Sequence, residues 1–556
     1  MNTFLKTYRL ALTPLSPIHI GCGEDFEPTN YLIDDGVLYG FDPSRANLDE
    51  RQRNDLSRLG LNADLLSIYQ FFRDNKQAFK AIANVLIPVT SGVARDFQEK
   101  LARVVQRESD RKDVFNKLGI ERAVGTGVAR VPFIPGSSLK GSLRTSDLNQ
   151  INDGRPIQYG EGDSKGGTSK LEKRLYEEKD FDTSPMRLVK VSDLMPNGDL
   201  DRSVSYAVMR RKRDPKTGEE KQTQDNLATR KEVISHGQYR KLIGEIVISL
   251  LGGLPESDNT PKKKFRRADL TALAHASNAY HLPKLEEELK ILDNRRFASE
   301  RWLVSLRCLL AGDLAIKLKQ DTAFLVRLGR YGGAETKTLD GIRSIFIPQA
   351  KRQEERYVTS SHCLWLAAND AKSRSDMLPF GWAIVEIDPQ EGDSPQLKAW
   401  CEAESKGRPD MVAKRREFEA ERAAAAKRKH ELLQEAEARE ATKLADKIAA
   451  QRRNEILAGM TDQAREVELL RSKCRELEAR LAGGGNFNKR AADANKPGVY
   501  QDATVLVKKV LESVDWSAVD RQALADMLEL WMPKVVAPWD AKEQRKKLKF
   551  AILRGQ

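Results

Sequence analysis

Apolar and polar residues alternate at the start of the chain. Between residues 4 and 12, large apolar side chains recur at every second position on one side, with Lys6 as the exception. A period of two predicts a half-buried strand. Residues 31–33 and 37–39 are two short apolar runs joined by an Asp-Gly turn, which predicts a hairpin. Residues 242–250 alternate as the N-terminus does, so we expect two similar α+β halves, each led by a strand.

Helical spacing dominates elsewhere, and it changes character after residue 405. Residues 268–312 carry ordinary amphipathic helices, and residues 380–387 close this region as a strand. Residues 411–458 are rich in Ala, Arg, Lys and Glu, without a sustained heptad of apolar positions, and predict a long solvated helix. From residue 500 the chain resembles a small helical bundle with two apolar stripes: Leu524, Met527, Leu528 and Trp531, then Leu548 and Ile552. We therefore divide the chain into residues 1–200, 201–400, 405–482 and 500–556.

One strand-to-helix connection is unusually informative. Residues 131–145 read VPFIPGSSLKGSLRT, an apolar strand, a Pro-Gly turn, two serines and a helix. Ser138 is placed to cap that helix, Lys140 and Arg144 share one helical face, and Gly141 leaves the backbone bare. Free amides of Gly136, Ser137 and Ser138, a positive helix end and two cations would cradle a phosphate. A solvated basic face is the alternative interpretation of the same residues.

Two more glycine segments could approach a polyanion. Residues 327–338 read RLGRYGGAETKT, in which Gly329, Gly332 and Gly333 would form a nest of backbone amides. Arg330 and Lys337 add positive charge, and Tyr331 is placed to stack on a base. The turn at residues 16–24 reads SPIHIGCGE and contains two further glycines.

Composition favours a nucleic-acid partner. The 556 residues include 94 Lys plus Arg and 81 Asp plus Glu, a net charge of +13, and Lys/Arg residues cluster at 262–267 and 542–549. Five scattered cysteines form no CxxC pair, which argues against a disulfide framework or a zinc site, and we predict no cofactor and no metal. No signal peptide or membrane-length apolar run is present, so we expect a soluble cytoplasmic protein of a prokaryote.

The segment IPGSSLKGSLRT closely resembles the signature turn of the RAMP superfamily, the repeat-associated RNA-binding proteins of CRISPR effector complexes. The turn at residues 16–24 and the loop at residues 327–338 resemble two further elements of that family, in the expected order. The wide spacing before the signature turn and the Phe41-Asp42-Pro43 element resemble the Csm-type subunit that caps the 3′ end of the CRISPR RNA (crRNA) in type III-A effectors. The resemblance covers residues 1–390 and implies two ferredoxin-like (RRM-type) domains with insertions.

The resemblance also implies a function. The chain would bind crRNA, cap the effector backbone, support crRNA maturation and antiviral defence, and lack enzymatic activity. Its partners would be crRNA, target RNA and the other effector subunits, chiefly the repeated backbone subunit, while a recruited host nuclease is a further partner considered for the tail. Two alternatives remain: a ribonuclease that processes crRNA through His19 or cleaves target RNA through Asp25, and a scaffold acting through its C-terminal tail.

Overall fold

We describe a computed structural model of the chain. It describes residues 5–62, 65–102, 118–158, 161, 167–177, 184–213, 228–249, 269–347, 356–483, 489 and 491–556. The chain forms two compact units, Met1–Arg422 and Ala423–Gln556. The basic cluster at residues 262–267 lies outside the described residues. The helix α11 (Met411–Ala458) runs across the boundary between the units.

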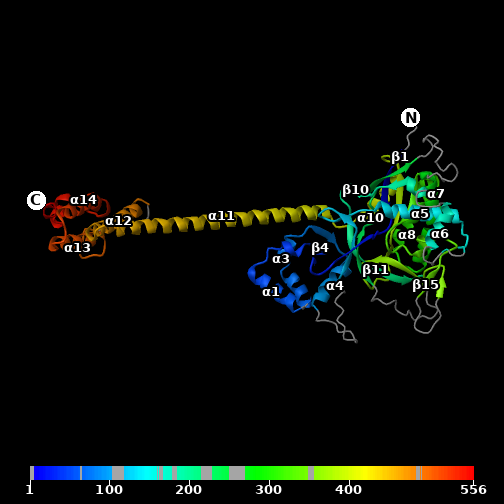
Figure 1. Cartoon of the computed structure of the whole chain (residues 1–556), viewed down its shortest axis with the longest axis horizontal. Helices are drawn as coiled ribbons and strands as arrows, with labels where there is room; N and C mark the ends of the chain where they lie inside the picture. Colours follow the sequence, from blue (N-terminus) through cyan, green and yellow to red (C-terminus); the bar gives the residue numbers. More distant parts are fainter. Residues whose placement is uncertain are drawn as a thin grey trace. The chain divides into compact units, whose positions relative to one another are not determined.

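The first unit contains two large sheets (Figure 1). In the first, the strand order is β10 (Met195–Pro196), β13 (Leu242–Ser249), β1 (Leu5–Pro14), β19 (Trp382–Ile387) and β14 (Ala323–Arg327), with β9 (Val189–Val191) also beside β13. In the second, the order is β18 (Leu378–Pro379), β17 (Cys363–Ala368), β11 (Arg202–Arg211), β12 (Thr229–Ile234), β6 (Ile120–Ala123) and β2 (Gly21–Phe26). Strands from both halves of the sequence therefore share each sheet.

Three smaller sheets complete the strand content. Their members are β3 (Tyr31–Asp34), β4 (Val37–Gly40) and β5 (Val85–Pro88), then β7 (Gly125–Thr126) with β8 (Val131–Pro132), and β15 (Ile345–Ile347) with β16 (Arg356–Val358). The turn between β3 and β4 has positive φ at both Asp35 and Gly36, which suits the twist of a two-residue hairpin.

Helices cover the sheets and bury their apolar faces. They are α1 (Glu50–Leu61), α2 (Leu65–Asp74), α3 (Lys76–Lys80), α4 (Ser91–Ala102), α5 (Gly136–Asn152), α6 (Gly167–Tyr176), α7 (Leu270–Asn294), α8 (Glu300–Ala311), α9 (Asp313–Lys319) and α10 (Pro395–Ser405). On one side of the first sheet, Leu139 and Leu143 of α5 and Leu273 of α7 pack against Leu12 of β1 and Phe324 of β14. On the other side, α8, α9 and α10 contribute to a second core.

The second unit is a helical bundle. It contains the last part of α11 with α12 (Asp462–Ala482), α13 (Val499–Glu512), α14 (Ala518–Val535), α15 (Ala541–Lys547) and α16 (Phe550–Leu553). The first stripe is buried at Leu524, Met527 and Leu528 and partly buried at Trp531, whereas the second stripe is buried only at Leu548. Ile552 is exposed, and Phe550 and Leu553 of α16 are buried beside Leu548 instead, because a short break separates α15 from α16.

The α+β class and several predicted elements are confirmed. The N-terminal strand, the hairpin, the strand at residues 242–249 and the long helix at residues 411–458 all form. The strand β1 is not half-buried as predicted: it is largely exposed before Leu10 and buried from Leu10 onward, where it lies between β13 and β19. The strand β5 and the helix α6 were not predicted from the sequence. None of the helices in the described ranges is long and apolar enough to cross a membrane.

Candidate nucleic-acid interface

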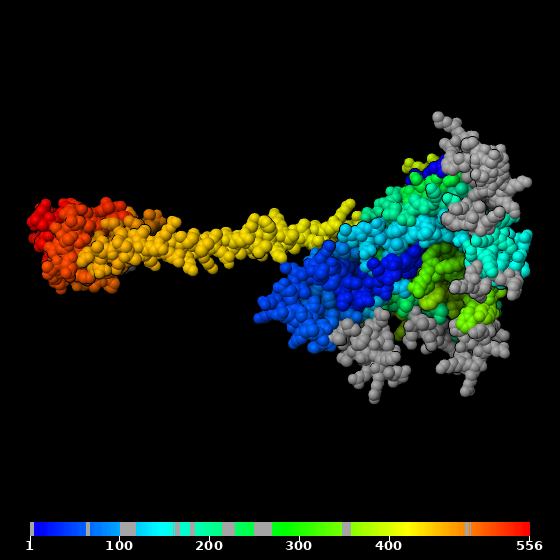
Figure 2. All heavy atoms as spheres, viewed as in Figure 1, coloured from blue at the N-terminus to red at the C-terminus, as the bar shows by residue number. Residues whose placement is uncertain are grey.

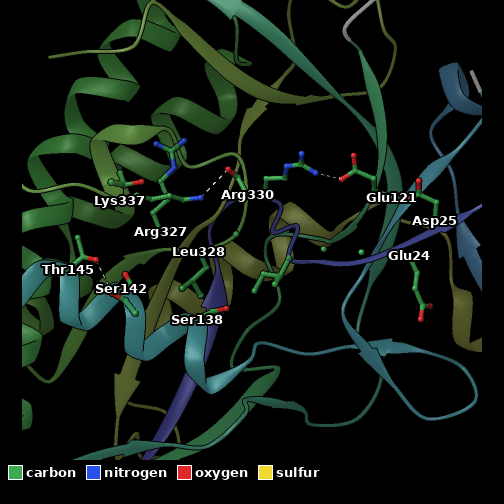
Figure 3. Close-up of a pocket in the computed structure, with 16 residues that line it drawn as sticks. Glu24, Asp25, Glu121, Ser138, Ser142, Thr145, Arg327, Leu328, Arg330 and Lys337 are labelled. Carbon is green, nitrogen blue, oxygen red and sulfur yellow. Dashed lines mark hydrogen bonds and ion pairs between the residues drawn. The ribbon is translucent and has the colours of Figure 1, made fainter. Parts of the chain in front are cut away.

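A cavity of about 750 Å³ opens where three glycine-containing segments meet in the first unit (Figure 3). The segments are β2 with the turn before it, the first half of α5, and the loop after β14. The lining residues are Ile20, Gly21, Gly23, Glu24, Asp25, Glu121, Ser138, Gly141, Ser142, Thr145, Arg327, Leu328, Gly329, Arg330, Thr336 and Lys337. Segments more than 300 residues apart in sequence therefore build one site.

The helix α5 presents hydroxyl groups to this cavity. Ser138, Gly141, Ser142 and Thr145 have the spacing of one helical face, and all four line the cavity. A Cβ added to Gly141 would meet nothing within 4 Å, so the helix backbone is open to a ligand at this point. In Figure 3 the Ser138, Ser142 and Thr145 side chains project from the same helix.

The start of α5 differs from the prediction. The helix begins at Gly136 with Pro135 at the N-cap, so Ser138 lies in the first turn and is not the cap. The Gly136 amide donates to Asp193 Oδ1 at 2.8 Å, which leaves that amide occupied, whereas Ser137 is exposed. Glycine is required at position 136 because a Cβ there would lie 2.3 Å from the Val191 carbonyl oxygen. This glycine lets the helix start approach the end of β9 closely.

Lys140 and Arg144 lie outside the cavity lining, on a neighbouring face of α5. The guanidinium of Arg144 pairs with the carboxylate of Glu172 on α6. Partial burial and the charge of Arg144 lower the pKa of Lys140. The structure thus separates these two cations from the glycine segments with which the sequence grouped them.

The loop after β14 contributes the opposite wall. Gly329 has a φ of +86°, and a Cβ there would lie 2.2 Å from the carbonyl oxygen of His19, so only glycine fits. The Arg330 amide donates to the same His19 carbonyl at 3.2 Å. These contacts fix the loop against the turn at residues 16–24 and hold two sides of the cavity together. Gly332 is buried and Gly333 has a φ of +75° at the start of a short 3-10 helix (Ala334–Thr336).

Tyr331 does not offer a ring for base stacking. It is buried, and its ring centroid lies 5.1 Å from that of Trp365 and 5.0 Å from that of Phe380. The ammonium of Lys231 lies 5.5 Å from the same ring. The predicted stacking role is therefore corrected to a packing role, because both neighbours belong to the same small core as Tyr331.

Three cations line the cavity, but they are not equivalent. Arg327 is buried and forms a two-pronged ion pair with Glu288, so its charge is balanced within the protein. Arg330 is 65% exposed and contacts Glu121 at 2.9 Å. Lys337 donates to the Arg330 carbonyl at 3.2 Å, and within the described ranges no carboxylate lies within ion-pair distance of it. Loss of surrounding water and the charges of Arg327 and Arg330 lower the pKa of Lys337.

His19 and Asp25 have opposite environments. His19 is 1% exposed, and its Nδ1 lies 2.7 Å from the Glu232 carbonyl, which can only accept a hydrogen bond. Burial lowers the pKa of His19, and its Nε2 faces the Glu121 carboxylate at 3.6 Å. A buried imidazole held in this way is a structural group and is closed to an RNA substrate. Asp25, in contrast, is exposed on β2 and lines the cavity beside Glu121.

Sequence patterns missed the charged network beneath the cavity. Burial alone would raise the pKa of Glu121, but the hydrogen bond and charge of the fully buried Lys231 hold it below its ordinary value. The next residue along β12, Glu232, accepts from Arg202 Nη1 at 2.9 Å and from the Ala123 amide at 3.0 Å. The sequence signal for this network is the run of three charged residues inside β12, because charged side chains are rarely buried unless they are paired.

The chemistry of this cavity suits a phosphodiester backbone. Hydroxyl groups, open helix backbone and two exposed cations can contact phosphates and riboses, whereas Glu24, Asp25 and Glu121 limit its positive charge. No group of three or more His, Cys, Asp or Glu side chains suited to a metal occurs among the described residues.

Comparisons with known proteins cover part of the chain. Residues 11–271 match the family model of the RAMP superfamily. A curated relative, the "CRISPR system Cms protein Csm5" of Streptococcus thermophilus, is 29% identical over 156 residues, covering 27% of this chain and 40% of that protein. The match thus spans two fifths of the relative's length.

Two solved structures are also similar to this chain. One is a chain of the Csm-crRNA-target RNA ternary complex of a type III-A CRISPR-Cas system, with 15% identity and a TM-score of 0.38. The other is Csm5 of T. onnurineus, with 16% identity and a TM-score of 0.36. Each covers 68% of this chain and 100% of the matched chain.

Proposed function

The chain belongs to the RAMP superfamily, as its glycine-containing motifs predicted, and from this premise we propose that it is a crRNA-binding subunit of a type III CRISPR effector complex. In this proposal it caps the effector backbone at the crRNA 3′ end and supports crRNA maturation. Its partners are crRNA, target RNA and neighbouring Csm-type subunits. The similarity to Csm5 supports the type of complex.

The cavity is the observation that carries RNA binding. Three motifs that are far apart in the chain converge on it, and each places backbone or a small side chain at its surface. Arg330 and Lys337 supply charge, Gly141 exposes helix backbone, and Ser138, Ser142 and Thr145 supply hydroxyls. Such contacts hold the sugar-phosphate backbone without selecting a base sequence.

A salt titration of RNA binding tests this role. Each phosphate contact on a single strand contributes about 0.7 to the slope of log affinity against log salt. Replacing both Arg330 and Lys337 with Ala should reduce the slope by about 1.4, so a rise from 50 to 200 mM salt costs the variant about sevenfold less affinity than the parent. An unchanged slope would refute RNA contact at the cavity.

The matched control is Lys140→Ala with Arg144→Ala. This pair removes the same net charge from a face of α5 outside the cavity lining. If this control reduces the salt-dependence slope more than the cavity variant does, the phosphates are bound by Lys140 and Arg144, as the sequence suggested. Capping itself is tested by assembling the effector with and without this chain, where omission should leave crRNA 3′ ends of mixed length.

Target-RNA cleavage through Asp25 is the second candidate, because Asp25 is exposed and lines the cavity. Our proposal expects no cleavage of repeat or target RNA by the purified chain. If cleavage is lost in Asp25→Ala but persists in His19→Ala, the chain is a nuclease that acts through Asp25, and the capping proposal is wrong. The scaffold alternative predicts no salt-dependent RNA binding at all.

A further inference from the structure

A second cavity, of about 670 Å³, lies between the C-terminal part of α11 and α12 in the second unit. Its lining residues are Ala445, Ile448, Ala449, Arg452, Arg453, Ile456, Leu457, Glu468, Ser472, Arg475 and Glu476. In Figure 1, α12 lies beside the end of α11. We call this cavity the α11–α12 groove.

The α11 wall of the groove is apolar and uncovered. Ile448 is 43% exposed and Ile456 is 61% exposed, and α11 has no buried residue along its length. Figure 2 shows the yellow-to-orange surface of α11 uncovered in that view. Ala445 and Ala449, four residues apart, keep this wall shallow, so that another helix can approach closely.

The α12 wall is polar and fixed in place. It presents Glu468, Ser472, Arg475 and Glu476 to the groove. The other face of α12 packs into the bundle core through Val467, Leu470 and Cys474, which prevents the helix from turning an apolar face to the groove. At the connection, Arg465 of α12 donates to the Leu457 carbonyl at 2.7 Å and to the Met460 carbonyl at 3.1 Å.

The charges along the groove are not balanced. Arg453 pairs with Glu476 at 3.1 Å, and Glu468 pairs with Arg471 at 2.7 Å. For Arg452 and Arg475, no carboxylate of the described residues lies within ion-pair distance, and the Arg475 guanidinium lies over the Trp531 ring at 5.6 Å. An occupant that carries carboxylates beside an apolar stripe would complement both walls. The apolar wall and the two glutamates make the groove unsuited to a phosphate backbone.

We propose that the α11–α12 groove binds an amphipathic, acidic helix of a partner protein. The residues from 445 to 457 span about three helical turns, or roughly 18 Å, which matches a short helix laid along the groove. Its apolar stripe contacts Ile448, Ile456 and the two alanines, and its carboxylates contact Arg452 and Arg475. This site lies outside residues 11–271, where the RAMP match ends, and it does not depend on RNA binding.

The test uses designed helical peptides and the full-length chain. One peptide carries a Leu/Ala stripe flanked by Glu, a second has Lys at every Glu position, and a third is a scrambled form of the first. Fluorescence anisotropy should show saturable binding of the Glu peptide, with the Lys and scrambled peptides at least tenfold weaker. No preference for the Glu peptide would overturn the proposal.

Substitutions in the groove then locate the binding site. Ile448→Asp with Ile456→Asp should lower the affinity for the Glu peptide by roughly 30-fold or more. The control Leu530→Asp changes an exposed apolar residue outside the groove lining and should leave that affinity unchanged. Arg452→Glu with Arg475→Glu should reverse the preference in favour of the Lys peptide. Circular dichroism confirms that each variant keeps its helix content, because the substituted side chains are exposed or half-exposed.

Two outcomes would assign the groove to another occupant and overturn the proposal. The first is a concentration-dependent dimer in sedimentation that Ile448→Asp with Ile456→Asp abolishes, since the occupant would then be a second copy of the chain. The second is loss of RNA affinity in the same variant with no change in peptide binding, which would assign the groove to nucleic acid.

Discussion

Gly329 should be the most sensitive glycine of the cavity. Gly329→Ala places a methyl group 2.2 Å from the His19 carbonyl oxygen, and the loop also has a φ of +86° there. The contact is with backbone, so no rotamer change relieves it. The two chain segments must separate by about 0.8 Å to reach a tolerable distance of 3.0 Å, and that movement also stretches the hydrogen bond from the Arg330 amide to His19.

Gly23 provides a matched control for the conformational part of this cost. Its φ is +83°, close to that of Gly329, but a Cβ there would meet nothing within 4 Å. Alanine at either position costs about 1–2 kcal/mol for a left-handed backbone. Gly329→Ala adds about 1–3 kcal/mol of overpacking, so the two variants should differ by that amount.

The measurement is hydrogen exchange read by mass spectrometry on the peptide that contains residues 324–338, alongside urea unfolding of both variants. We expect the Arg330 amide to exchange at least about fivefold faster in Gly329→Ala than in Gly23→Ala, the ratio that corresponds to 1 kcal/mol. Equal exchange and equal unfolding free energies would show that the close approach of Gly329 to His19 does not hold the cavity walls together.

Three further predictions follow from single contacts. Gly141→Ala should raise the free energy of unfolding by about 0.5–1 kcal/mol, because alanine favours a helix interior. The same substitution should lower the affinity for RNA in filter binding, because the added methyl group fills the open face of the helix. An unchanged affinity would show that RNA binds elsewhere. Burial lowers the pKa of His281 to about 3. Below pH 6.5 the unfolded chain therefore takes up a proton at this residue that the folded chain does not. From this group alone, the free energy of unfolding should fall by about 2 kcal/mol between pH 7 and pH 5. His281→Gln should remove that part of the decline in urea titrations, and an identical pH profile would contradict the assignment. Glu232→Ala should cost about 3–5 kcal/mol because it leaves the Arg202 guanidinium buried without its partner, whereas Arg202→Met with Glu232→Leu should cost much less in the same assay.

Local patterns predicted much of the secondary structure. The long helix at residues 411–458 forms with the predicted bounds, since charge pattern and alanine content act within a few residues. The hairpin at residues 31–39 formed for the same reason, because an Asp-Gly turn encodes its own geometry.

The glycine-containing motifs predicted which segments line the cavity, but not which of their side chains face it. Lys140 and Arg144 share a helical face, as spacing required, and yet that face lies outside the cavity lining because Leu139 and Leu143 must point into the core. Tyr331 was assigned to RNA, but its neighbours Trp365 and Phe380 come from β17 and the turn before β19. Only long-range packing brings those rings together.

The sequence alone therefore determined the elements, the three glycine segments and the basic character of the chain, because these depend on residues close together along the backbone. Tertiary structure decided that β1 lies between β13 and β19 and that Gly329 touches the turn at His19. It also decided that Glu121 in the cavity lining pairs with the buried Lys231, and that Glu232 accepts from the Ala123 amide. Contacts between segments hundreds of residues apart depend on how both sheets bury their faces together, and no local pattern along the chain carries that information.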